Sequence, residues 1–135
     1  MQVLMDTGPW VALVDRSESK HKECVAWLQE FKGEIYSTEA VLTEVLYLLN
    51  FSSAAQIAAL DFILTGAIIL APSTIDSLAT VKSLMAKYKD FPMDFADATL
   101  VSLAHDLSIN NIVTFDRKHF SVYRLFKSRS FIVWP

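Results

Sequence analysis

Cysteine, glycine and proline are scarce in this sequence. Its 135 residues include one cysteine, three glycines and four prolines. The lone Cys24 excludes an intramolecular disulfide, and the amphipathic stretch 22–28 around it predicts a buried thiol rather than a reactive one. This cysteine usage fits a reducing compartment, so we expect a cytoplasmic protein. Repeats, low-complexity segments and linkers are also lacking, and we expect one domain spanning 1–135.

Long apolar runs are missing too. The most apolar region, 54–72, is interrupted by Gln56, Asp61 and Gly66, whereas a membrane-spanning helix needs about 20 nearly uninterrupted apolar residues. At the N-terminus no basic region precedes an apolar stretch, and Asp6 comes too early for a signal peptide. We therefore expect neither a membrane span nor a leader.

Positive charge is not in excess. The chain has 12 basic and 15 acidic residues, for a net charge of −3, which argues against a general nucleic-acid binder. If four acidic residues bound metal ions, 11 would remain against 12 basic residues, and the cations would recruit phosphates. Hydrophobic residues are plentiful, at 53%. This share indicates a generous core or an apolar surface kept for a partner.

Short strand-like patterns alternate with longer helical ones. Strands are expected at 2–5, 34–37, 67–71, 111–115 and 130–134. Helices are expected around 9–15, 20–31, 38–50, 53–65, 74–88 and 94–107. Strands joined by helical crossovers pair in parallel and have helices on both faces. The predicted fold class is therefore α/β, a three-layer α/β/α sandwich with a mainly parallel central sheet.

Two carboxylates follow expected strands. Asp6 comes directly after the first strand, and Asp116 comes just past the strand at 111–115. Functional sites of such sheets form beyond the carboxyl ends of the strands, so both are expected at one edge. Each also has a structural explanation, since Asp6 or Thr7 could cap the following helix and Asp116 could be a turn residue.

Further carboxylates lie in helical segments. Glu44 interrupts the apolar stretch 41–49, and Asp97 heads a helix that continues with apolar residues. Asp94 and Asp97 share a helix face, although this pair also suits a capping arrangement. If all converged on one pocket they would repel one another, and a divalent cation would relieve that repulsion. Oxygen ligands of this kind suit Mg²⁺ or Mn²⁺.

Four motifs occur together in a fixed order. They are MDTG at 5–8, STEAVLTEVLYLL at 37–49, FADATLVSLAHDLSI at 95–109 and IVTFDRKHF at 112–120. In order, spacing and context they resemble the PIN domain family of ribonucleases, and within it the VapC-type toxins of toxin–antitoxin pairs. The resemblance spans nearly the whole chain. Gly8 and Pro9 stand where other members often carry different residues.

The resemblance implies a catalytic and metal-binding set, namely Asp6, Glu44, Asp97 and Asp116. Asp97 is the better match to the family's third acid because it precedes a small residue in the pair Asp97-Ala98. Asp94 has no firm counterpart and is expected to be an accessory acid or a cap. Thr114 matches the hydroxyl that precedes the fourth acid, and it is expected to orient a carboxylate or a water.

The activity that the resemblance implies is endonucleolytic hydrolysis of RNA with Mg²⁺ or Mn²⁺, through one or two ions, leaving 5′-phosphate and 3′-hydroxyl ends. Its implied partners are an RNA substrate, a cognate antitoxin protein and a second copy in a homodimer. Arg117, Lys118 and His119 are candidates for contacts with RNA phosphates. A solvated basic turn is an equally good explanation of them.

Candidate interface residues are Trp10, Tyr47, Phe51 and the apolar helices around 41–64, although helix stripes of this kind usually pack internally. His21 and His105 lack ligand-like spacing and are expected to be structural.

Other classes of protein remain as alternatives. A non-catalytic PIN-fold binding or scaffold module is one, and a PIN ribonuclease outside a toxin–antitoxin system is another. A receiver domain would need paired acids after the first strand and an acid after the third, and Asp6 stands alone. A haloacid-dehalogenase-type phosphatase would need a second Asp at position 8, which is Gly8.

Overall fold

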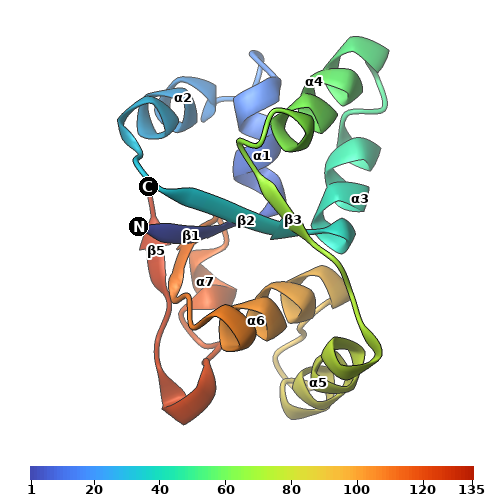
Figure 1. Cartoon of the computed structure of the whole chain (residues 1–135), viewed down its shortest axis with the longest axis vertical. Helices are drawn as coiled ribbons and strands as arrows, with labels where there is room; N and C mark the ends of the chain where they lie inside the picture. The colour runs from blue at the N-terminus through green and yellow to red at the C-terminus, as the bar shows by residue number, and fades with distance from the viewer.

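Five parallel strands form the central sheet of the computed structural model (Figure 1), in the order β3-β2-β1-β4-β5. The structure describes residues 1–135, apart from the side chain of Phe126. The strands are β1 (Gln2–Met5), β2 (Glu34–Thr38), β3 (Ile69–Ala71), β4 (Asn111–Val113) and β5 (Ile132–Trp134). β1 is central, since Leu4 is in register with Tyr36 of β2 on one side and Ile112 of β4 on the other.

Helices cover both faces of this sheet. One face carries α1 (Thr7–Val14), α2 (His21–Glu30), α3 (Glu39–Leu48) and α4 (Ser53–Leu64). The other carries α5 (Ile75–Lys87), α6 (Phe95–Leu107) and the single turn α7 (Arg117–Phe120), and a short 3₁₀ turn, Phe126–Ser128, follows. Figure 1 shows the resulting three layers, which confirm the predicted sandwich.

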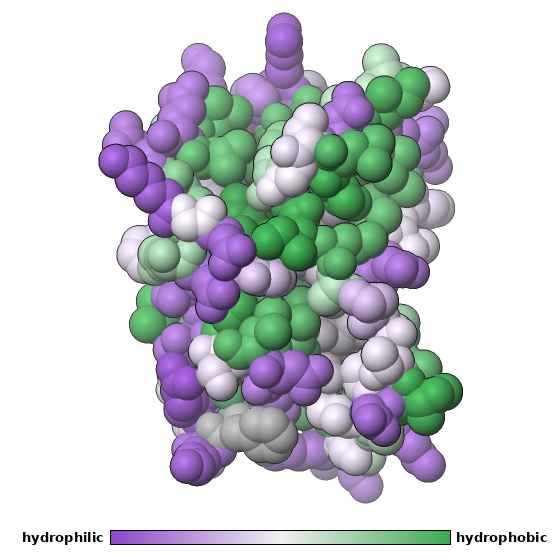
Figure 2. All heavy atoms as spheres, viewed as in Figure 1, coloured by the Kyte–Doolittle hydropathy of each residue, from purple (hydrophilic) through white to green (hydrophobic). Residues whose placement is uncertain are grey.

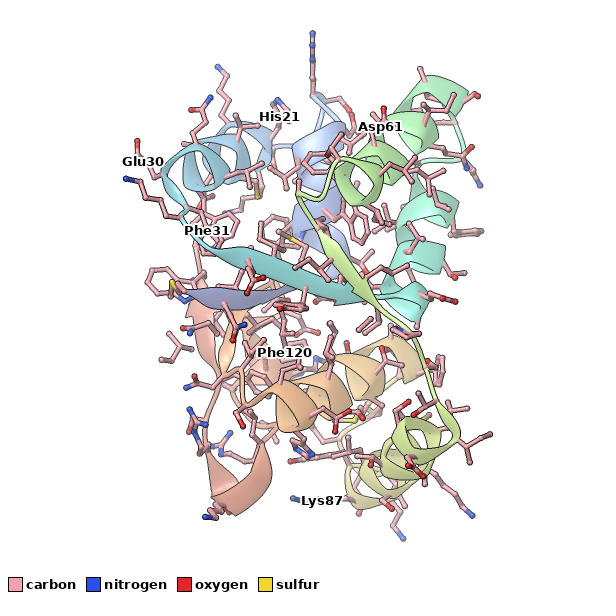
Figure 3. All side chains as sticks on the ribbon, viewed as in Figure 1. His21, Glu30, Phe31, Asp61, Lys87 and Phe120 are labelled. Atoms are coloured by element: carbon pink, nitrogen blue, oxygen red, sulfur yellow. The ribbon has the colours of Figure 1, made fainter. Side chains whose placement is uncertain are left out.

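The core lies on both sides of the sheet, and the central strands are apolar for that reason. Val3, Leu4 and Met5 of β1 are fully buried. Trp10 of α1 is fully buried as well, so of its two expected roles, interface or internal packing, the structure confirms internal packing. Phe120, labelled in Figure 3, packs edge-on against Phe131 with ring centroids 5.4 Å apart.

Element boundaries differ from the sequence predictions at several points. The third strand begins at Ile69 instead of 67, because Gly66 takes a positive φ of 85° and Ile68 N donates to Phe62 O at 2.8 Å. The last strand begins at Ile132 instead of 130. The strand expected at 111–115 ends at Val113, where the chain turns toward α7.

The structure also bears on two further expectations, that Cys24 is a buried structural residue and that no helix spans a membrane. Cys24 is buried, and desolvation raises the pKa of its thiol to about 11, which fits the structural role predicted for it. Among the residues that the structure describes, no helix is long and apolar enough to cross a bilayer.

Candidate active site

The carboxyl ends of β1 and β4 lie side by side and bring two acids to one edge of the sheet. Asp6 N donates to Val113 O at 3.0 Å, which extends the pairing of the two strands. The buried Thr114 hydroxyl then donates to Asp6 Oδ2 at 2.6 Å and accepts from Asp116 N at 3.0 Å. Thr114 therefore links the two strand-end acids, as its predicted orienting role requires.

Asp6 also caps α1. Its Oδ1 accepts from Thr7 N at 2.8 Å, while the Thr7 hydroxyl is buried and has no hydrogen-bond partner among the described residues. The helix thus begins at Thr7, and Asp6 rather than Thr7 is its cap. Burial raises the pKa of Asp6 most, the bonds from Thr114 and Thr7 partly lower it, and the charge of Asp116 raises it further.

Glu44 projects from α3, whose start is fixed by Thr38. The Thr38 hydroxyl accepts from Val41 N at 3.3 Å and lies 2.8 Å from the hydroxyl of Thr99 on α6. These contacts hold the first turn of α3 against α6. The pKa of Glu44 is raised by desolvation and then by the charges of Asp94 and Asp6.

Asp94 and Asp97 occupy the start of α6. Asp94 is the helix cap, since its Oδ1 accepts from Asp97 N at 2.8 Å. This confirms one of its two expected roles. Burial raises the pKa of Asp97 to about 8, and repulsion from Asp94 and Asp6 adds to the effect.

A buried tyrosine holds Asp97. Tyr123 Oη donates to Asp97 Oδ2 at 3.1 Å, and its distance to Pro92 O is 3.2 Å. The side chain is fully buried, and its ring packs edge-on against Tyr88 and Phe120. Burial and the neighbouring charge of Asp97 raise the pKa of the Tyr123 phenol, so it remains a donor.

His119 contacts the fourth acid. Asp116 caps α7, accepting at Oδ1 from His119 N at 3.1 Å, and His119 Nδ1 lies 2.9 Å from the same oxygen. The segment expected as a basic turn is therefore a helical turn. Arg117 and Lys118 are both exposed, and Arg117 Nη2 donates to Pro135 O at 2.7 Å. His21 and His105 serve backbone carbonyls, at 2.7 Å from Ala12 O and 3.3 Å from Arg124 O respectively.

These residues form one electrostatic unit, which we call the acidic cluster and which consists of Asp6, Glu44, Asp94, Asp97 and Asp116. The pKa values of Asp6, Glu44 and Asp97 are raised, and repulsion by other members of the cluster contributes to each of these shifts. Glu44 and Asp94 also line one cleft, together with Ala40, Thr43, Phe95 and Ala96. Mutual repulsion among its carboxylates is the electrostatic condition that favours a bound cation.

A metal's ligand shell is not formed in the structure. Among the described residues, no group of three or more His, Cys, Asp or Glu side chains is arranged to hold an ion. The donor chemistry nevertheless fits, because carboxylate oxygens that repel one another suit Mg²⁺ or Mn²⁺.

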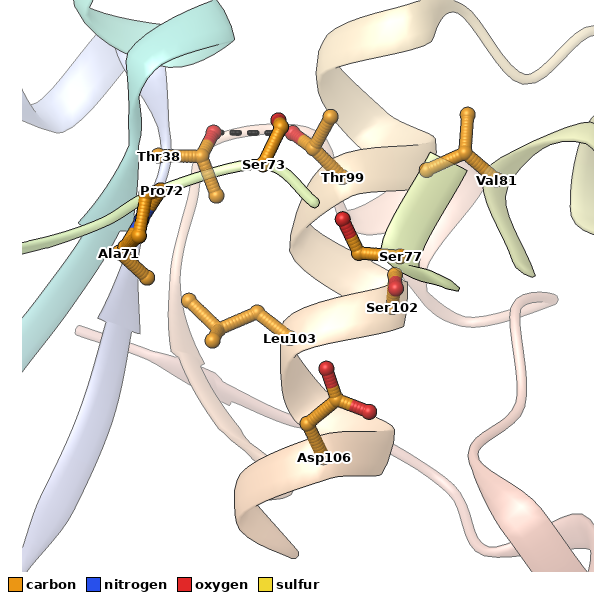
Figure 4. A pocket seen from close by; sticks show the side chains of 10 residues that line it. All are labelled: Thr38, Ala71, Pro72, Ser73, Ser77, Val81, Thr99, Ser102, Leu103 and Asp106. Atoms are coloured by element: carbon orange, nitrogen blue, oxygen red, sulfur yellow. Dashed lines mark hydrogen bonds between the residues drawn. The ribbon is translucent and has the colours of Figure 1, made fainter. Parts of the chain in front are cut away.

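A separate hydroxyl-lined pocket lies between the end of β3, α5 and α6 (Figure 4). It includes no member of the acidic cluster, and the contact between Thr38 and Thr99 forms part of its wall. Ser102 lines it with a buried hydroxyl that has no hydrogen-bond partner among the described residues. Asp106, also on α6, is exposed.

The sequence profile of the PIN domain family matches residues 3–125, and the chain belongs to this family.

Among characterised relatives, the chain is 27% identical over 135 residues to Ribonuclease VapC26 of Mycobacterium tuberculosis, with 98% of this chain and all of that protein covered. Solved structures that share its fold include the following two. One is VapC20 of Mycobacterium tuberculosis, described as a sarcin-ricin loop cleaving toxin, with a TM-score of 0.78, 21% identity and coverage of 85% and 90% of the two chains. The other is VapBC2 from Rickettsia felis bound to a promoter DNA fragment, with a TM-score of 0.71, 16% identity and full coverage of both chains.

Proposed function

We propose that this chain is a metal-dependent endoribonuclease that hydrolyses RNA phosphodiester bonds, and that it is the toxin of a type II toxin–antitoxin pair. The observation that carries the proposal is the acidic cluster, gathered at the carboxyl edge of a parallel sheet in a member of the PIN domain family. A relative named as a ribonuclease and a neighbouring structure described as a toxin support the same activity.

In this proposal Asp6, Glu44, Asp97 and Asp116 hold Mg²⁺ or Mn²⁺. The bound metal supplies activation of a water and stabilisation of the departing 3′ oxygen. Thr114 orients Asp6 through its 2.6 Å hydrogen bond, and Tyr123 orients Asp97 in the same way. These buried contacts preorganise two carboxylates before substrate arrives.

Asp94 has an accessory role in this proposal. It caps α6 and adds negative charge to the unit. Arg117 and Lys118 are both exposed. Lys118 is the better candidate for an RNA phosphate contact, because Arg117 already donates to Pro135 O.

We further propose an antitoxin partner and a homodimer, both in the cytoplasm, with residues 1–135 acting as one nuclease domain. Support comes from an apolar surface on α3, α4 and the loop that joins them, where the exposed fractions of Tyr47, Phe51 and Leu64 are 71%, 66% and 80%. Figure 2 shows apolar side chains gathered over α4 and β3. Apolar patches of this kind mark interaction sites. Light scattering that gave only monomer at high concentration would remove the dimer.

A non-catalytic PIN-fold module is the second candidate. It is favoured by the lack of a formed metal shell among the described side chains. Calorimetric titration with millimolar Mg²⁺ or micromolar Mn²⁺ separates the two, because the scaffold would bind neither. A PIN ribonuclease outside a toxin–antitoxin pair would bind metal and cleave RNA, but it would lack an antitoxin encoded by the adjacent gene.

Cleavage of labelled, structured RNA tests the proposed activity. Purified protein is expected to cleave with Mg²⁺ or Mn²⁺ and to stop when the metal is chelated. Asp6→Asn and Asp97→Asn are expected to abolish cleavage. Asp106→Asn, an exposed acid of α6 outside the acidic cluster, is the matched control and should cleave like wild type. Unchanged cleavage by either cluster variant would contradict the proposed site.

A further inference from the structure

An aromatic side chain stands exposed beside the acidic cleft. Phe95 is the first residue of α6, it lines the cleft with Glu44 and Asp94, and 46% of its surface is accessible. Single exposed apolar residues are common on proteins. The inference therefore rests on the position of Phe95 rather than on its exposure alone.

The ring of Phe95 is left free while nearby rings are packed. Tyr88 and Phe91 both pack edge-on against Tyr123, with ring centroids 5.1 Å and 6.4 Å from it. Among the described side chains, Phe95 contacts no other aromatic ring. Its other cleft neighbours include Ala40 and Ala96, which are too small to cover a ring.

The backbone at Phe95 is held in place. Asp94 caps the helix through its 2.8 Å bond from Asp97 N, and this bond fixes the first turn, to which Phe95 belongs. A fixed backbone limits the ring to a few rotamers and presents it next to Asp94. Such a ring loses little conformational entropy when a flat ligand stacks on it.

We propose that Phe95 is the stacking platform for an unpaired nucleobase of the RNA substrate. The inference rests on the proposed ribonuclease function and deepens it by naming the part of the substrate that enters this cleft. Every base has a face that stacks on an aromatic ring. Bases within a duplex are stacked on one another, so the platform selects single-stranded segments, loops or ends.

The chemistry of the cleft identifies a base as the occupant of the Phe95 ring. The proposed metal ions at Glu44 would take the substrate phosphate, whereas the ring offers an apolar face beside the Asp94 carboxylate. A base stacks on such a face, and its exocyclic amino groups offer donors to that carboxylate. An apolar protein segment suits the cleft less well, because it would desolvate both carboxylates without pairing them.

A second exposed ring supports the same assignment. Phe115 directly precedes Asp116, and 40% of its surface is accessible. Its ring lies over Gly8, where an added Cβ would come within 2.8 Å of it. Two members of the acidic cluster therefore have an exposed aromatic residue as their neighbour in the sequence. Phe95 follows Asp94, and Phe115 precedes Asp116.

Steady-state cleavage of a single-stranded RNA tests the platform. Phe95→Ala is expected to raise KM about five- to a hundredfold, the range for loss of one stacked base, with kcat little changed. Phe95→Trp should restore KM and Phe95→Leu should not, because leucine supplies apolar area without a stacking face. Ile75→Ala, which removes an exposed side chain of α5, is the control. An unchanged KM in Phe95→Ala, or full rescue by Phe95→Leu, would overturn the inference.

A binding measurement without turnover separates this inference from the proposed function. The probe is a single-stranded RNA decamer that carries one 2-aminopurine, titrated at fixed salt with the metal chelated, and stacking is expected to quench its fluorescence. If wild type quenches the fluorescence and Phe95→Ala does not, the platform is supported. If wild type nevertheless cleaves no RNA, only the proposed ribonuclease function fails. Equal quenching by both proteins, or quenching by neither, overturns the platform. Weakened antitoxin binding by Phe95→Ala with unchanged RNA binding would assign the ring to a protein partner and overturn it as well.

Discussion

Asp97→Asn is expected to stabilise the metal-free protein while it removes metal binding. The substitution leaves a side-chain oxygen to accept from Tyr123, so the hydrogen bond at 3.1 Å can persist. What it removes is a charge that burial and the charges of Asp94 and Asp6 disfavour. The same residue would thus weaken the fold and be required for activity.

The magnitude follows from the pKa of Asp97, which rises from an ordinary 3.8 to about 8 on folding. pH 7 lies about 3 units above the pKa of Asp97 in the unfolded state. At 1.4 kcal/mol per unit, the raised pKa lowers the free energy of unfolding at pH 7 by about 4 kcal/mol. Asp97 is only partly buried, and water screens its charge. We therefore expect a gain of about 2 kcal/mol in the free energy of unfolding.

The sign of the pH dependence is set by the raised pKa. Below about pH 4 the carboxyl is protonated in both folded and unfolded states, so it costs nothing. As pH rises toward 8, the unfolded state ionises first and the wild type loses stability relative to the variant. The stability difference between the two proteins should be near zero at pH 4 and largest near pH 8.

Urea denaturation with a metal chelator, at several pH values between 4 and 8, measures this difference. Adding Mn²⁺ should stabilise wild type and leave Asp97→Asn unchanged, because ligands stabilise only the state that binds them. If Asp97→Asn is less stable than wild type at pH 7, or if the difference does not depend on pH, the explanation of the raised Asp97 pKa by burial and then by repulsion from Asp94 and Asp6 is refuted.

Three further substitutions test other contacts. Tyr123→Phe removes the donor to Asp97 Oδ2, so we expect calorimetry to give about tenfold weaker Mn²⁺ binding while the aromatic packing is kept; unchanged affinity would contradict the orienting role. Gly8→Ala places a Cβ 2.8 Å from the Phe115 ring and should lower the free energy of unfolding by about 1 to 2 kcal/mol in denaturant melts. Ser102→Ala removes a buried hydroxyl without a partner among the described residues and should leave stability unchanged or raise it by up to about 1 kcal/mol, whereas a clear loss would show that this hydroxyl is satisfied in solution.

Much of the fold follows from sequence because its signals are local. Alternating short apolar runs and amphipathic stretches locate every strand and every long helix, and burial of β1 on both faces explains its unbroken apolar character. Boundaries were less accurate where tertiary contacts decide them. Gly66 and the hydrogen bond from Ile68 N to Phe62 O shorten β3, and no local sequence pattern predicts that hydrogen bond.

The acids of the candidate site could be proposed from their positions relative to expected strands and helices. Their supporting residues could not all be found this way. Thr114 was suggested by its place before Asp116, and His119 had the i+3 spacing of a residue that donates to a helix cap. Tyr123 and the pair Thr38 and Thr99 carried no such signal, because their partners lie 26 and 61 residues away.

The central position of β1 has a consequence for the order in which activity can arise during synthesis. The first strand made is the one whose neighbour β4 comes more than a hundred residues later, and Asp6 meets Thr114 only across that pairing. A ribosome-bound chain that lacks β4 therefore holds Asp6 without its orienting hydroxyl and without Asp116. The complete set of acids can therefore assemble only after nearly the whole chain has left the exit tunnel.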